Sequence, residues 1–249
     1  MYDDDELALL EAEIELDPLD QVGNEPAEFV QPDPEQMLAL LDSPNNQQRM
    51  LATRAFCEIE DARAIPRLIQ LLSDPCPLVR VSAAYGLGRN PSPTAVEPMI
   101  LQLRQDWNGY ARKGMVWALG NCRDRRALEP LVEALKTDIS AVRLWAASAL
   151  AQMTDVNYES IIGAIPPLIE GLRRDPEAAV RSNCAWAVGQ LCRELPSNVV
   201  YATAIDALIE AFAEDPEIGV CEDAKTAVLK VGDTRGLQVI EEIERNGSL

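Results

Sequence analysis

The chain has 249 residues, of which 47% are hydrophobic and 25% charged, and it carries a net charge of −19. This composition is typical of a soluble globular protein. The negative charge disfavours binding to nucleic acid or to an anionic membrane and favours partners with basic patches. The sequence contains no His, which removes the commonest general base and the usual zinc ligand. No apolar run approaches the ~18 residues of a membrane span, and the acidic N-terminus is unlike a targeting peptide. We therefore expect a cytoplasmic protein.

The first segment in chain order is an acidic leader, residues 1–36, which holds thirteen Asp or Glu and no Lys or Arg. Within it, ELALLEAEIEL places Leu7, Leu10 and Ile14 at helical spacing. This stretch is either a short amphipathic helix, docked on the rest of the chain or on a partner, or a disordered tail. Four prolines in DPLDQVGNEPAEFVQPDP indicate a flexible linker after it.

Residues 37–249 contain a unit that recurs six times. The units begin at residues 43, 74, 106, 137, 175 and 215, often with Asp-Pro, and the intervals between them are 31 to 40 residues. Six residues after each start, the first five units have an arginine and the sixth has Cys221; the arginines are Arg49, Arg80, Arg112, Arg143 and Arg181. Self-similarity at this period predicts an all-α solenoid of about six helical-hairpin repeats.

Each unit is predicted to form two helices. Asp-Pro supplies an N-cap oxygen and a proline at the first helical position, so it predicts the start of the first helix. That helix ends near a glycine such as Gly88 or Gly120, interpreted as a C-terminal cap. The second helix has a proline in its first turn, as at Pro98 and Pro166. The two longest intervals come from inserts between paired helices, at TDVNYES and RELPSN.

One side of each first helix is predicted to be buried. Counted from the repeat arginine at about 100° per residue, offsets +3, +4 and +7 share this side and hold small or aliphatic residues such as Ala83, Ala84 and Leu87. Offsets +2, +5 and +9 fall opposite, where charged residues would be expected. They instead hold aromatic rings, amides and one arginine: Tyr85, Arg89, Trp117, Asn121, Trp145, Gln152, Asn183, Trp186 and Gln190. We predict that these nine residues form a partner-binding stripe.

Other interpretations of these residues stay open. Neighbouring helices or the leader could cover the rings of the stripe, since Trp is often largely buried. Trp107 lies in a turn and is expected to pack between repeats. The repeat arginines are expected to pair with carboxylates or carbonyls of the turns as a ladder between units, the alternative being a phosphate or carboxylate site. The six Cys form no CxxC pair and are expected to be small apolar residues of the helices.

The DPxxxVRxxAA runs at 74–84 and 175–185 and the GDTRGLQVI turn at 232–240 resemble the HEAT-like repeats of the phycobilisome-lyase type. The resemblance covers about residues 42–243 and implies an α-α superhelix, while such arrays serve many functions. The relative deoxyhypusine hydroxylase binds two irons through His-Glu pairs, and a chain without His lacks them.

The leader and the stretch from Arg80 to Leu135 are similar to cyanobacterial HEAT-repeat proteins that bind the A-type iron–sulfur scaffold IscA. This implies a non-enzymatic adaptor, with no catalytic residue, metal or cofactor of its own, whose partner belongs to iron–sulfur cluster assembly. The alternative resemblance is to a phycobilin lyase subunit or a bilin-binding chaperone for phycobiliprotein chromophore attachment. It implies a bound tetrapyrrole and is the one enzyme class retained.

Overall fold

The computed structural model describes residues 32–245 of the chain, which form helices and loops without any strand in that range. The chain divides into two units, Met1–Asp33 and Pro34–Leu249. The leader predicted at residues 1–36, with its amphipathic stretch, lies outside the described residues except for residues 32–36. Within the described part, no helix is long and apolar enough to cross a membrane.

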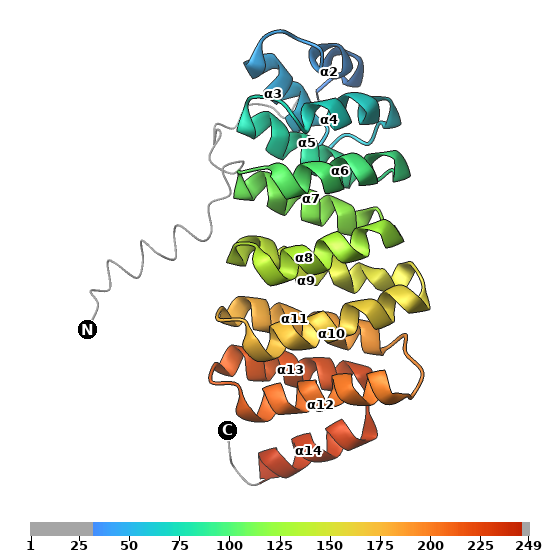
Figure 1. The fold of residues 1–249 in the computed structure, drawn as a ribbon, viewed down its shortest axis with the longest axis vertical. Helices are drawn as coiled ribbons and strands as arrows, with labels where there is room; N and C mark the ends of the chain where they lie inside the picture. The colour runs from blue at the N-terminus through green and yellow to red at the C-terminus, as the bar shows by residue number, and fades with distance from the viewer. Residues whose placement is uncertain (1–31, 246–249) are drawn as a thin grey trace, which may run out of the picture. The chain divides into compact units, whose positions relative to one another are not determined.

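The second unit is a stack of helical hairpins arranged in two layers (Figure 1). It opens with a short helix, α2 (Pro34–Leu40), and six hairpins follow. The first helices of the hairpins form one layer: α3 (Asn46–Ala55), α5 (Pro77–Arg89), α7 (Gly109–Asn121), α9 (Ser140–Ala151), α11 (Ala178–Cys192) and α13 (Ile218–Val231). The second helices form the other layer: α4 (Ile65–Leu71), α6 (Pro93–Gln105), α8 (Leu128–Thr137), α10 (Tyr158–Arg174), α12 (Val199–Glu214) and α14 (Thr234–Arg245). The predicted solenoid of six hairpins is confirmed.

The odd-numbered helices pack closely on one another, each against the next, from α3 to α13. Their buried side is the predicted one: Ala83, Ala84 and Leu87 of α5 are all fully buried. Because these side chains are small, neighbouring helices approach closely, and dispersion contacts along the whole layer stabilise the stack. Below, the solvent side of the odd-numbered helices is called the odd-helix face.

The glycines within the last turns of the odd-numbered helices allow close approach of the next helix and do not act as C-terminal caps. Gly120 lies inside α7, where an added Cβ would come within 2.8 Å of the Ala149 Cβ and 2.9 Å of its Cα. The expected C-terminal caps at Gly88 and Gly120 are therefore wrong. Among the described residues, Gly232 is the glycine with positive φ, 75°, and it caps α13. The cap prediction failed because it considered a single helix, whereas the need for glycine comes from the next helix in the stack.

The Asp-Pro pairs also have a different position from the one predicted. The N-cap of α5 is Cys76, and Asp74 lies two residues before it, accepting a hydrogen bond from the Cys76 amide at 2.8 Å. Two of the prolines expected in first turns, Pro98 and Pro166, lie inside α6 and α10, because these helices begin earlier than the sequence indicated. The TDVNYES insert spans the end of the short helix η3 (Gln152–Asp155) and the first turn of α10, and the RELPSN insert is the loop before α12, so each lies at the junction of paired helices.

Candidate functional site

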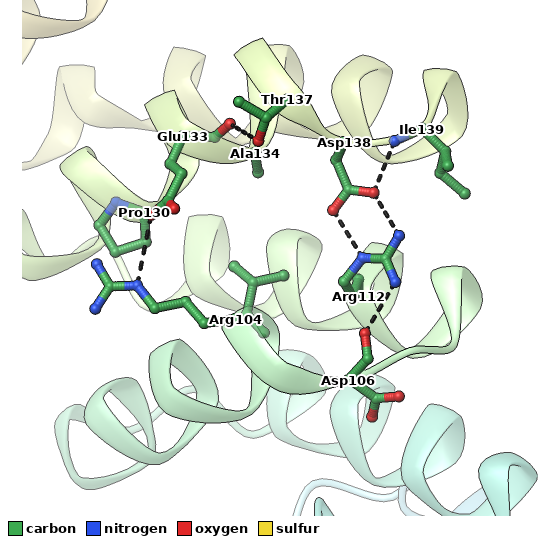
Figure 2. Close-up of a pocket in the computed structure, with 10 residues that line it drawn as sticks. Arg104, Asp106, Arg112, Pro130, Glu133, Ala134, Thr137, Asp138 and Ile139 are labelled. Carbon is green, nitrogen blue, oxygen red and sulfur yellow. Dashed lines mark hydrogen bonds and ion pairs between the residues drawn. The ribbon is translucent and has the colours of Figure 1, made fainter.

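The repeat arginines form a ladder along one edge of the stack, as predicted. In one rung, Arg112 Nε donates to Asp138 Oδ2 at 2.7 Å, Nη2 donates to Asp138 Oδ1, and Nη1 donates to the Asp106 carbonyl at 2.9 Å (Figure 2). Four further rungs have the same form: Arg49–Asp74, Arg80–Asp106, Arg143–Asp175 and Arg181–Asp215. Each aspartate is the one near the start of the next unit, so every rung ties one repeat to the following one.

The side chains of these rungs are largely buried. Burial by itself raises the pKa of Asp106, but hydrogen bonds from Arg80, the Asn108 amide and Gln102 outweigh that effect and hold its pKa below the usual range. The hydrogen bond to Asp106 in turn raises the pKa of Arg80. Both groups are therefore charged at neutral pH, and each charge is compensated inside the protein.

Pockets of ≈310, ≈290 and ≈400 Å³ open along the same edge, between successive even-numbered helices. Figure 2 shows the first, between Arg104 and Glu133 on one side and Arg112 and Asp138 on the other. Its arginines are already paired with carboxylates, Arg104 with Glu133 at 3.5 Å and Arg112 with Asp138. The charged groups along the ladder edge therefore join repeats to one another, which is a structural role.

The rings of the predicted stripe lie in a row on the odd-helix face and are partly exposed. The Tyr85 and Trp117 rings are 5.5 Å apart between centroids and tilted by 43°. The Trp117 ring also lies directly over Gly88 of the preceding repeat. Lys113 Nζ lies 5.4 Å from the centre of the Trp145 ring. Tyr85, Trp117 and Trp145 are half-buried, so neighbouring helices cover one part of each ring and leave another part accessible.

Trp186 differs from the other stripe tryptophans because it is 36% exposed. It borders an open groove of ≈620 Å³ on the odd-helix face. The groove crosses three repeats, with Leu144 and Ser148 contributed by α9, Asn183 and Trp186 by α11, and Asp223 by α13. Grooves of this size can hold a side chain or a small ligand.

The polar members of the stripe are used partly within the protein. Asn121 Nδ2 donates to the Gly88 carbonyl at 3.1 Å, and Asn183 Nδ2 donates to the Leu144 carbonyl and to Ser148 Oγ, both at 2.6 Å. These amides therefore join repeats to one another. The remaining three are half-buried or exposed: Gln152 in η3, Gln190, which accepts from Arg193 at 3.4 Å, and Arg89, which pairs with Glu60 at 3.5 Å.

Three accessible apolar residues of the same face were missed, the first being Leu51, which is 54% exposed and lies at offset +2 from Arg49. Leu78 and Tyr110 are 40% and 44% exposed, and each lies two residues before the repeat arginine of its helix. On the helical wheel this position, offset −2, lies at about 160°, between offset +5 and offset +9. Both residues therefore belong to the same side of the helix as the stripe. The signal for Leu78 and Tyr110 was therefore present in the sequence, at a position before the arginine and not after it.

Trp107 was expected to pack between repeats, but its side chain is 75% exposed. Its contact across the repeat boundary is with the guanidinium of Arg80, whose Cζ lies 5.6 Å from the ring centre. The Arg80 guanidinium is nearly buried in its rung, and the indole covers it while leaving its own outer surface to solvent.

The cysteines are interior residues for the most part. Cys184, Cys192 and Cys221 are buried, and Cys57, Cys76 and Cys122 are half-buried. Burial raises the pKa of Cys184 and of Cys192 to about 12. Across residues 32–245, no group of three or more His, Cys, Asp or Glu side chains is placed to hold a metal ion.

Comparison with known proteins agrees with this architecture. A family model described as HEAT repeats matches residues 34–100 and 96–160, and another described as HEAT repeat matches residues 164–195. Among curated proteins, none matches this chain significantly.

Several solved structures are similar in fold. An engineered protein is 24% identical over 80% of this chain and 98% of its own, with a TM-score of 0.60. A designed armadillo repeat protein in complex with the peptide (KR)4 is 21% identical over 80% of this chain and 100% of its own, with a TM-score of 0.60. Yeast importin-beta is 19% identical over 89% of this chain and 34% of its own, with a TM-score of 0.59. At these identities the likeness shows the fold alone.

Proposed function

This chain belongs to the HEAT-repeat family, and from that premise we propose that it is a non-enzymatic adaptor whose odd-helix face binds a partner protein. The observation that carries the proposal is the row of partly exposed rings on that face, Tyr85, Trp117, Trp145 and Trp186. Neighbouring repeats contact three of these rings: Gly114 lies against Tyr85, Gly88 against Trp117, and Lys113 beside Trp145. A ring fixed in advance loses little conformational entropy on binding, which is the property of a good interface anchor.

The A-type iron–sulfur scaffold IscA is the partner that we propose, on the basis of the resemblance of the leader and of residues 80–135 to HEAT-repeat proteins that bind it. The thirteen carboxylates of residues 1–36 would attract a basic surface of such a partner over a distance of about one Debye length. They would mainly raise the association rate.

The proposal is tested by calorimetric titration of the protein with a purified IscA-type scaffold. Trp186→Ala removes the most exposed ring of the row and should weaken binding at least about tenfold, with unchanged helical circular dichroism. Trp107→Ala is the matched control, because Trp107 is more exposed yet lies on the ladder edge. Equal affinities of the two variants and the wild type would contradict a binding role of the odd-helix face.

A kinetic binding measurement with the same scaffold tests the leader. Removal of residues 1–33, the first of the two units, should reduce the association rate and flatten its dependence on salt, while the dissociation rate changes little. A dissociation rate that rises as much as the association rate falls would mean that the leader contacts the bound partner directly.

A tetrapyrrole is the second ligand to consider, because the groove beside Trp186 has a volume of ≈620 Å³, within the usual range of small-molecule sites. A bilin bound there would change its visible absorption spectrum, and Trp186→Ala would abolish the change. An unchanged spectrum on mixing a bilin with the wild-type protein would argue against a lyase or bilin-chaperone role.

The peptide bound by the designed armadillo repeat protein, (KR)4, offers a simple probe. Since the likeness to that protein shows the fold alone, the peptide serves here to measure which charge the odd-helix face prefers. An octapeptide of Glu and Ser is the corresponding acidic probe.

A further inference from the structure

The groove beside Trp186 presents hydrogen-bond acceptors and negative charge. Asn183 donates two hydrogen bonds through Nδ2, to the Leu144 carbonyl and to Ser148 Oγ. A carbonyl only accepts, so the amide nitrogen must face Leu144, and this fixes the orientation of the side chain. Its Oδ1 is therefore the atom left to accept a hydrogen bond from a ligand.

Asp223 adds a full negative charge to the groove. It lines the groove from α13, at the position in its repeat that Asn183 and Trp145 occupy in theirs. No ion pair or hydrogen bond engages its carboxylate within residues 32–245. Lys225, on the same helix, pairs with Glu244 at 2.7 Å. Glu222, beside Asp223, is also exposed and increases the negative potential.

The rest of the groove is suited to an aliphatic chain. Leu144 and Ala179 line it together with the accessible face of Trp186. A lysine or arginine side chain combines an apolar stem with a charged end, and an indole face attracts that charge, most strongly when water is displaced. The groove therefore offers a complementary surface to each part of a cationic side chain.

We propose that this groove binds a lysine or arginine side chain from a basic segment of the partner protein. The inference rests on the proposed adaptor function and specifies its chemistry: the stem lies along Leu144 and the Trp186 ring, and the charged end bonds to Asp223 and to Asn183 Oδ1. The same groove rejects acidic segments, because Asp223 and Glu222 repel them. The basic contact is thus placed in the repeats formed by α9, α11 and α13.

The test is a titration of the full-length protein with (KR)4, followed by isothermal calorimetry at low and moderate salt. The wild type should bind the basic peptide and not the Glu-Ser octapeptide. Asp223→Asn should weaken binding at least fivefold and Trp186→Ala at least tenfold. Glu214→Gln is the matched control: it removes one exposed carboxylate from α12, in the even-numbered layer, and should leave the affinity within twofold.

Equal affinity of Asp223→Asn and Glu214→Gln would overturn the proposal, since a general effect of net charge would then explain the binding. Failure of the wild type to bind the basic peptide would overturn it as well. The adaptor function would survive either result if the IscA-type scaffold still binds and Trp186→Ala still weakens that complex. If that complex is also insensitive to Trp186, both proposals fail. Asp223 and Trp186 are accessible, and a thermal melt of each variant confirms that a lost signal comes from the groove.

Discussion

Replacing Asp106 by Asn changes the most buried rung of the ladder, where the Arg80 side chain is 7% exposed and that of Asp106 is 0% exposed. The amide has the shape of the carboxylate but a single acceptor oxygen. Arg80 therefore keeps at most one of its two hydrogen bonds to this side chain, 2.7 and 2.9 Å long in the wild type. Its bond to the Asp74 carbonyl remains, so the cation stays at the junction of repeats without a counter-charge.

The expected loss of stability is about 3 kcal/mol, at the lower end of the cost of breaking a buried ion pair, because the Asp74 carbonyl still solvates part of the charge. With an m-value of about 2 kcal/mol/M, the urea midpoint should fall by about 1.5 M. The matched control is Glu133→Gln, which breaks the pair with Arg104 across the neighbouring pocket. Both of those side chains are more than half exposed, so the midpoint should barely move.

The assay is urea denaturation followed by circular dichroism at pH 7, with tryptophan fluorescence as a second probe. A solenoid is stabilised mainly by contacts between adjacent repeats. Asp106→Asn should therefore also separate the unfolding transition seen by circular dichroism from the one seen by fluorescence, or lower the apparent m-value. A midpoint for Asp106→Asn within 0.3 M (about 0.6 kcal/mol at that m-value) of that for Glu133→Gln would refute the reasoning that the ladder couples the repeats.

Three further predictions concern protonation, packing and thiol chemistry. The pKa of Asp106 is lower in the folded state than in the unfolded state. Its carboxylate therefore stabilises the fold fully above the unfolded pKa of about 3.9, and this stabilisation is lost as the pH falls through the lower folded-state pKa. The difference in urea midpoint between the wild type and Asp106→Asn should accordingly shrink below about pH 4. Gly120→Ala should lower the free energy of unfolding by about 1–3 kcal/mol, because the new methyl meets the next helix. Gly219→Ala, with nothing within 4 Å, should raise it by up to about 1 kcal/mol in the same melts. With pKa values near 12, Cys184 and Cys192 should not react with a disulfide reagent at pH 8 until urea unfolds the chain, and fast modification of either in the native protein would contradict their burial.

The fold could be predicted from the sequence because its signals are local and repeated. An arginine at a fixed distance from the start of each of the first five units marks the same kind of rung, and Arg112 meets Asp138 as Arg80 meets Asp106. The glycines were misinterpreted for the opposite reason. A Gly near the end of a helix predicts a cap when that helix is considered alone, whereas Gly120 is required by the close approach of Ala149 in the next repeat.

The candidate site could be predicted only in outline. Helical periodicity predicted that Tyr85, Trp117 and Trp186 lie opposite the buried side of their helices, and the structure leaves each ring partly exposed. It could not tell how much of each ring a neighbouring repeat covers, because that depends on helix spacing. The same limit applies to Asn183, whose amide bonds to Leu144, 39 residues earlier in the chain. The sequence alone does not single out Asp223, because the groove that it lines is formed by three repeats together.

The two ends of the hairpins differ in their tolerance to changes in length. At the ladder end, the sequence separation between partners grows from 26 residues in the Arg112 rung to 34 in the Arg181 rung, while the Nε–Oδ2 distances stay at 2.7 and 2.8 Å. The extra residues lengthen the helices: α11 has 15 residues where α7 has 13, and α12 has 16 where α8 has 10. The ladder thus keeps its geometry while the hairpins grow at the opposite end. The turns at that end, such as residues 193–198 after α11, are suitable sites for grafting a reporter peptide, or even a small folded module, without disturbing the register of the array.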